Sequence, residues 1–150
     1  MQKNPTYSEI TNLILTKDDF NILIRELDLL EESLYEIKNN FDSVLKNSVR
    51  SEVSKLISNA ILNQDKAKVL KEIRLEMNQI KFAEIILAKD PSNEFISKIS
   101  DWLTKLQNRR IAINIKIDQS IIGGAIISFE GKYFDGSLKN KLEKILINYV

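Results

Sequence analysis

The chain has 150 residues, of which 43% are hydrophobic, and this is enough apolar material for one domain or two small ones. Lys and Arg total 22 against 21 Asp and Glu, so the composition implies no basic face for nucleic acid or an anionic membrane. The absence of cysteine excludes disulfides and a thiolate metal site, and the absence of histidine removes the commonest general base and metal ligand.

The first part of the chain, residues 1–82, is predicted to be a helical domain. Thr6 and Glu9 have capping-box spacing and predict a short helix to Leu15, while Thr16 and Asp19 give a second helix-start signal. The clearest helix is expected to have about 25 residues, because its apolar residues recur in alternating steps of four and three. Those residues are Leu23, Leu27, Leu30, Leu34, Ile37, Phe41 and Val44. Such a stripe either packs within the chain or pairs with another chain as a coiled coil, for which three heptads are short.

Two further helices are predicted before residue 82. Their apolar residues are Val49, Val53, Leu56, Ile57, Ala60 and Ile61 in the third helix and Val69, Leu70, Ile73, Met77 and Ile80 in the fourth. No glycine or proline interrupts this part after Pro5, so polar clusters such as Asn39-Asn40 must separate the helices. The paired acids Asp18-Asp19 and Glu31-Glu32 are interpreted as solvated helix faces, since no histidine accompanies them.

The pattern changes in residues 83–150, which are predicted to form a second, α/β domain. A short apolar run at 83–89 ends at Asp90-Pro91, and Ser92 can cap the helix that follows. That helix carries Trp102, which we expect in the core, with partner contact as the competing role. After Arg109-Arg110, interpreted as a solvated loop, four isoleucines alternate with other residues over 111–117 and predict a half-buried strand with the isoleucines on its core face.

All four glycines lie between Gly123 and Gly136. Residues 125–129 and 132–134 are predicted as strands joined by a tight hairpin at Glu130-Gly131, and a turn at Asp135-Gly136 precedes a final helix. Ser137 caps that helix, whose apolar face is formed by Leu138, Leu142, Ile145, Leu146 and Tyr149. The predicted fold class is therefore α+β, an N-terminal helical bundle followed by a small α/β domain with a mixed sheet and a terminal helix.

The pair Gly123-Gly124 has two interpretations. Successive backbone N–H groups could form a nest for a phosphate, but no Lys and Ser or Thr follow, and the next residues predict a strand rather than a helix. A bulge or a close approach of two backbones, without a ligand, is the favoured interpretation. Asp135 is likewise interpreted as part of turn and capping chemistry.

Two blocks within residues 111–145 resemble the C-terminal signature of the delta subunit of F-type ATP synthases, called OSCP in mitochondria. They are Asp118-Gln-Ser-Ile-Ile-Gly-Gly-Ala-Ile-Ile and, after a short hairpin, Phe134-Asp-Gly-Ser-Leu-Lys-Asn-Lys-Leu-Glu-Lys-Ile145. The resemblance extends more weakly over 83–150, where it implies a strand near 84–88 and a helix near 92–107. The family-signature residues, given a structural role, are Asp118, Ile121, Gly123, Gly124, Gly131, Asp135, Gly136 and Ser137.

The resemblance implies a non-catalytic stator subunit. In this family the helical domain grips the N-terminal segment of an alpha subunit, and the C-terminal domain binds the end of the b-type stalk. The implied stalk contacts here are Leu142 and Leu146 on the terminal helix, although this face could equally pack within the chain. Neither a cofactor nor a metal is implied, and neither is a nucleic-acid partner. The family's bundle usually has six helices, whereas residues 1–82 leave room for about four of them.

The expected location is the cytoplasm, on the inner face of the plasma membrane and attached to it only through the complex. The longest apolar runs are far short of the ~20 residues needed to span a bilayer, and residues 1–7 have no secretion or import signal. The alternative function is a helical adaptor that pairs with another chain through the long helix. An enzyme is the least favoured class, because the sequence has no recognisable nucleophile, base or cofactor motif.

Overall fold

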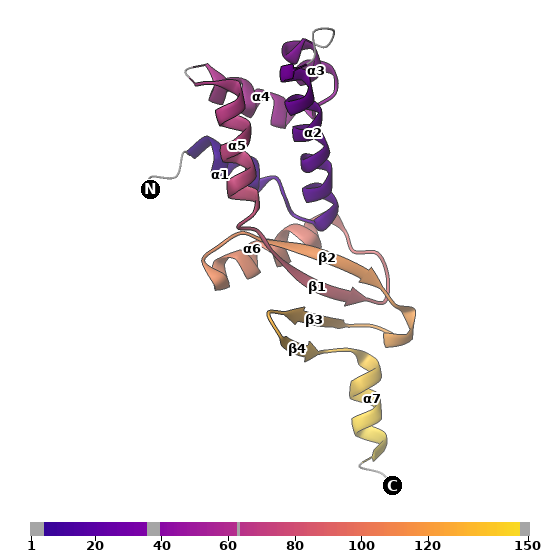
Figure 1. The fold of residues 1–150 in the computed structure, drawn as a ribbon. Coiled ribbons are helices and arrows are strands. Elements are labelled where there is room, and N and C mark those ends of the chain that lie inside the picture. The colour runs from indigo at the N-terminus through magenta and orange to yellow at the C-terminus, as the bar shows by residue number, and fades with distance from the viewer. Residues whose placement is uncertain (1–4, 36–39, 63, 148–150) are drawn as a thin grey trace. The chain divides into compact units, whose positions relative to one another are not determined.

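A computed structural model describes residues 5–35, 40–62 and 64–147, and these fold into two compact units (Figure 1). Unit 1 comprises residues 1–14 and 18–80, and unit 2 comprises residues 15–17 and 81–150. Unit 1 is helical, and the described part of unit 2 holds a four-stranded mixed sheet with two α-helices and a short 3₁₀ helix. The fold class is α+β, as the sequence predicted.

Within the residues that the structure describes, unit 1 has five helices. They are α1 (Pro5–Asn12), α2 (Lys17–Tyr35), α3 (Phe41–Asn47), α4 (Ser51–Ile61) and α5 (Lys66–Met77). Lys17 itself belongs to unit 2 by its contacts. Helix α1 packs on α4 and α5, α4 on α5, and α3 on α4. The core is aliphatic, and its fully buried side chains include Ile10, Leu23, Leu27, Leu30, Ile57, Leu70 and Ile73.

The predicted helix of about 25 residues is wrong, since the structure has two helices in its place. Helix α2 ends at Tyr35, and Asn40 has extended backbone angles and caps α3 by accepting a hydrogen bond from the Asp42 amide at 3.1 Å. Asparagine favours caps over helix interiors because its side chain competes for backbone hydrogen bonds. Ile37 lies outside the described residues, and the buried stripe on α2 packs within the chain, so the intramolecular alternative holds for Leu23, Leu27 and Leu30.

A carboxylate inside unit 1 joins α2 to α4. Glu26 is only 5% exposed, and its two carboxylate oxygens accept hydrogen bonds from the Arg50 backbone N–H at 2.8 Å, from Nε at 2.9 Å and from Nη2 at 3.0 Å. Arg50 is the N-cap residue of α4 and has no side-chain cap of its own. Glu26 therefore fixes the start of α4 while its charge is neutralised by the guanidinium.

Unit 2 is a sheet with strand order β2-β1-β3-β4. Its strands are β1 (Lys81–Leu87), β2 (Ile111–Ile117), β3 (Ala125–Phe129) and β4 (Lys132–Asp135). Strands β1 and β2 are parallel, and β1–β3 and β3–β4 are antiparallel, so the mixed sheet was predicted correctly. The crossover helix α6 (Asn93–Gln107) begins after Ser92, whose Oγ accepts from the Phe95 amide at 3.2 Å.

Helix α6 covers one face of the sheet. Two buried clusters lie there, one around Ala83, Leu103 and Ile111 and the other around Ile85, Leu87 and Ile113. The predicted burial of β2 is only partly correct: Ile111 and Ile113 are buried, but Ala112 is buried as well, and Ile117 is 44% exposed.

The prediction that Trp102 lies in the core is wrong, because its side chain is 56% exposed on α6. The sheet-facing side of α6 is occupied instead by Ile96, Ile99, Ser100 and Leu103. Arg110 also differs from the solvated loop that we expected, since its side chain is 12% exposed and lies 3.6 Å from Asp101. Its neighbour Arg109 pairs with Glu130 and lies over the Phe129 ring.

Candidate functional site

The predicted signature residues lie in unit 2, and all but Gly131 gather around the start of the terminal helix α7 (Leu138–Ile147); Gly131 lies apart, at the turn between β3 and β4. Asp118 follows β2, and its carboxylate accepts from the Ser120 amide at 2.9 Å, which caps the short 3₁₀ helix η1 (Gln119–Ile121). The hydrogen bonds from Ser120 hold the pKa of Asp118 below its ordinary value. Ile121 is buried, and α7 packs on η1.

Gly123 and Gly124 lead from η1 into β3. Gly124 has a φ of +76°, and a Cβ placed on it would lie 2.3 Å from the carbonyl oxygen of Gly136. The structure therefore shows a close approach of two backbones at this pair, with a strand and not a helix following it. Ile122, just before the pair, has a φ of +67°, an unusual value for a β-branched residue that the sequence gave no reason to expect.

The hairpin between β3 and β4 turns at Glu130 and Gly131, and both have positive φ, of 46° and 78°. This is the backbone that a two-residue hairpin turn of type I′ requires. A Cβ on Gly131 would meet nothing within 4 Å, so conformation alone favours glycine there.

Asp135 and Ser137 form the turn between β4 and α7. The Asp135 carboxylate accepts from the Ser137 amide at 2.9 Å, and the Ser137 hydroxyl accepts from the Asn140 amide at 3.2 Å. The Asn140 side chain donates back to the Asp135 carbonyl at 3.1 Å. The hydrogen bonds from Ser137 are the main cause that lowers the pKa of Asp135, with smaller contributions from Lys144 and Lys139.

This lowered pKa predicts an acid-sensitive turn. Because the folded pKa is depressed, the contribution of Asp135 to stability is complete above the unfolded pKa of about 3.9 and is lost as pH falls through the lower folded pKa. We expect the NMR titration of the Asp135 carboxyl carbon to have its midpoint below 3.9. Asp135→Asn keeps an acceptor oxygen but removes the titration, so unit 2 should then lose less stability between about pH 5 and 2 than the unchanged chain. A midpoint for Asp135 at or above the ordinary value would contradict the assignment.

Helix α7 presents an exposed apolar face. Leu138, Leu142 and Ile145 are 44%, 48% and 52% exposed, and their spacing of four and three places them on one side of the helix. The sequence left open whether this face is exposed or packs within the chain, and in the structure these three side chains are exposed. Leu146, the other candidate stalk contact, is part of α7, but its side chain lies outside the described residues.

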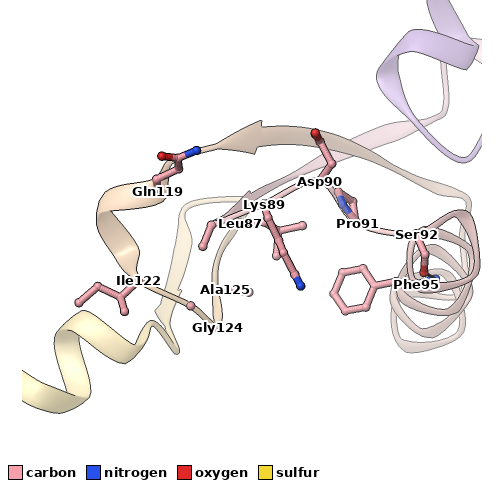
Figure 2. Close-up of a pocket in the computed structure, with 12 residues that line it drawn as sticks. Leu87, Lys89, Asp90, Pro91, Ser92, Phe95, Gln119, Ile122, Gly124 and Ala125 are labelled. Atoms are coloured by element: carbon pink, nitrogen blue, oxygen red, sulfur yellow. Dashed lines mark hydrogen bonds between the residues drawn. The ribbon is translucent and has the colours of Figure 1, made fainter.

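An open hollow of about 970 Å³ lies between the end of β1, the start of α6 and the glycine pair. Figure 2 shows the Phe95 ring reaching from α6 toward Lys89, while Ile122 points away from both of them. Much of the lining is apolar and includes Leu87, Pro91, Phe95 and Ala125. The sequence did not predict that Phe95 and Leu87 line a surface hollow, because nothing in their local pattern shows that β1 ends, and β3 begins, beside α6.

The segment Leu15–Lys17 is a second feature that the sequence did not show. The carbonyl of Leu15 accepts from the Ile113 amide at 2.9 Å, and Thr16 forms a parallel bridge with Ile113. A three-residue segment has no periodicity to read, so this addition beside β2 could not have been predicted.

Among residues 5–35, 40–62 and 64–147, no group of three or more Asp or Glu side chains is placed to hold a metal ion. In the same residues, no helix is both long and apolar enough to cross a membrane. An exposed apolar helix face beside a hydrogen-bonded turn is typical of a subunit that binds other proteins.

Comparison with known proteins agrees with this class and identifies the family. Residues 7–147 match the family described as ATP synthase delta (OSCP) subunit. The chain belongs to this family, and the resemblance seen in its C-terminal residues is confirmed.

Curated relatives are likewise delta subunits. ATP synthase subunit delta of Aquifex aeolicus is 38% identical over 89 residues, which are 58% of this chain and 49% of the relative. That of Wigglesworthia glossinidia brevipalpis is 36% identical over 124 residues, 81% of this chain and 66% of the relative. The chain thus spans about half to two thirds of the length of these two relatives. A relative from Propionigenium modestum, named sodium ion specific, is 25% identical over 93% of this chain and 82% of its own length.

A chain in a solved structure of the Polytomella F-ATP synthase is also similar, at 21% identity and a TM-score of 0.39, covering 45% of this chain and 90% of that chain. No residue or contact of this chain is assigned from that similarity.

Proposed function

We propose that the chain is a non-catalytic stator subunit of an F-type ATP synthase. It would link the catalytic head to the b-type peripheral stalk, so that the head stays still while the rotor turns and rotation is coupled to ATP synthesis and proton transport. Family membership over residues 7–147 supports the assembly, and the exposed apolar face of α7 is the observation that supports a binding role within it.

The two parts of the chain have separate tasks in this proposal. Residues 83–150 bind the C-terminal end of the b-type subunit, with Leu142 and Leu146 as contacts, and the signature residues within 118–137 have a structural role in this part of the chain. Half-exposed Leu142 can enter an interface without losing core packing. The three lysines of α7 can form a polar rim around such a contact, as is usual at protein interfaces.

Residues 1–82 would bind the N-terminal segment of an alpha subunit. Unit 1 carries exposed apolar side chains on two helices, Ile22 and Leu29 on α2 and Leu75 on α5, which suit a protein partner better than an ion or a nucleotide. The chain would then associate with the membrane only through the complex.

The test is recovery of the complex from the native host. An affinity-tagged copy of the full chain is expected to bring down the alpha and b-type subunits in constant ratio. Recovery of the tagged chain alone, while alpha and b-type subunits still purify together without it, would overturn the proposal.

A further inference from the structure

The first turn of α7 lies against three glycines, Gly123, Gly124 and Gly136. We call these glycines, together with Leu138 of α7, the glycine socket. Two backbone hydrogen bonds join the segment before β3 to the segment after β4. The Leu138 amide donates to the Gly123 carbonyl and the Gly136 amide donates to the Ala125 carbonyl, both at 2.9 Å. The residues that enter β3 and those that leave β4 are therefore tied together where α7 begins.

The fit of the socket leaves no room for side chains at its floor. A Cβ on Gly124 would come within 2.3 Å of the Gly136 carbonyl oxygen, which is backbone and cannot move without moving the turn. A Cβ on Gly123 would come within 2.8 Å of Leu138 Cδ1, which is the end of a flexible side chain. The two glycines thus face different obstacles, one rigid and one soft.

The direction of α7 depends on this seat. Beyond its first turn the helix exposes Leu142 and Ile145, and it packs on η1 beside the socket. Ten residues give a helix about 15 Å long, so a tilt of about 10° at the first turn moves its far end by roughly 2–3 Å. Such a shift is enough to misplace an apolar contact that needs close packing.

We infer that Gly123 and Gly124 are positioning residues: the first leaves space for Leu138 and the second for the Gly136 carbonyl, and together they set the angle at which α7 presents its apolar face to a partner. The partner is the C-terminal end of the b-type subunit, so the expected change in binding rests on the proposed function. Gly124 itself need not touch the partner.

The matched comparison is Gly124→Ala against Gly131→Ala in the full chain. The two glycines have φ of +76° and +78°, so both substitutions place alanine at a similarly unfavourable positive φ, but only a Cβ on Gly124 would meet a backbone atom. With a synthetic peptide of the b-type subunit's C-terminal segment, we expect at least about tenfold weaker binding for Gly124→Ala and less than about twofold for Gly131→Ala. Residual dipolar couplings should show α7 rotated against β1 in the first variant and unmoved in the second.

A second pair keeps the inference testable if Gly124→Ala unfolds unit 2. Gly123→Ala presses only on Leu138, so the double variant Gly123→Ala/Leu138→Ala should place α7 and bind the peptide as Leu138→Ala alone does. Equal peptide affinity for Gly124→Ala and Gly131→Ala, or unchanged couplings of α7 in Gly124→Ala, would overturn the inference, as would additive losses in the double variant.

Failure of the proposed function has a different signature. If the unchanged chain does not bind the peptide, the stalk contact is wrong, and the dipolar couplings alone then decide whether Gly124 sets the angle of α7. Rotated couplings in Gly124→Ala support the inference, and unchanged couplings refute it.

Discussion

Replacing Leu142 with aspartate is expected to weaken binding of the b-type subunit's C-terminal peptide by at least about tenfold, or about 1.4 kcal/mol. Leu142 is 48% exposed, so the substitution removes an apolar contact and introduces a charge without opening a cavity in the core. Isothermal titration calorimetry with the full chain measures the change.

Leu62→Asp is the control for this substitution. Leu62 is 76% exposed in unit 1, so the same chemical change there should leave affinity for the stalk peptide within about twofold. Equal losses in the two variants would mean that the charge acts at long range or that Leu142 is not a contact.

The second large effect concerns the stability of unit 1. Glu26→Ala is expected to lower the free energy of unfolding of unit 1 by about 2–3 kcal/mol. The substitution leaves the Arg50 amide and part of the Arg50 guanidinium without their acceptor, and water has little access to the buried position of the Glu26 carboxylate. Hydrogen exchange of α2 and α4 amides in increasing urea reports this change. The single tryptophan, Trp102, belongs to unit 2, so its fluorescence serves as an internal reference.

Glu31 offers a matched control on the same helix. It also holds an arginine through two hydrogen bonds, from Arg74 Nε at 2.6 Å and Nη2 at 3.1 Å, but its side chain is 37% exposed. Water can replace it, so Glu31→Ala should cost less than about 1 kcal/mol. Equal costs for Glu26→Ala and Glu31→Ala would show that the burial of Glu26 is unimportant.

Local chemistry was the part of the fold that the sequence could predict. The caps at Ser92 and Ser137, the hairpin at Glu130-Gly131 and the strand over 111–117 depend on neighbours a few positions away, and all appear in the structure, although the burial of that strand does not alternate as predicted. The turn at Asp135 is of the same kind, because its carboxylate bonds two residues ahead.

Features that depend on distant residues could not be predicted. Glu26 reads as one more charged residue on a helix, and only the fold brings Arg50 to it, 24 positions away. Trp102 has the spacing of a core residue, yet the sheet beneath α6 is filled by other side chains. The sequence around Gly124 allows a nest for a phosphate or a close approach of two backbones, and only the fold shows that the Gly136 backbone lies beside it.

If one chain joins the stalk to the head, it must bind a segment of each at the same time, and a sequential calorimetric titration measures this. The full chain is first saturated with the b-type subunit's C-terminal peptide and then titrated with the alpha subunit's N-terminal peptide. We expect both peptides to bind with one-to-one stoichiometry, the second to the complex that the chain forms with the first. Binding of neither peptide, or displacement of the first by the second, would contradict the proposed function.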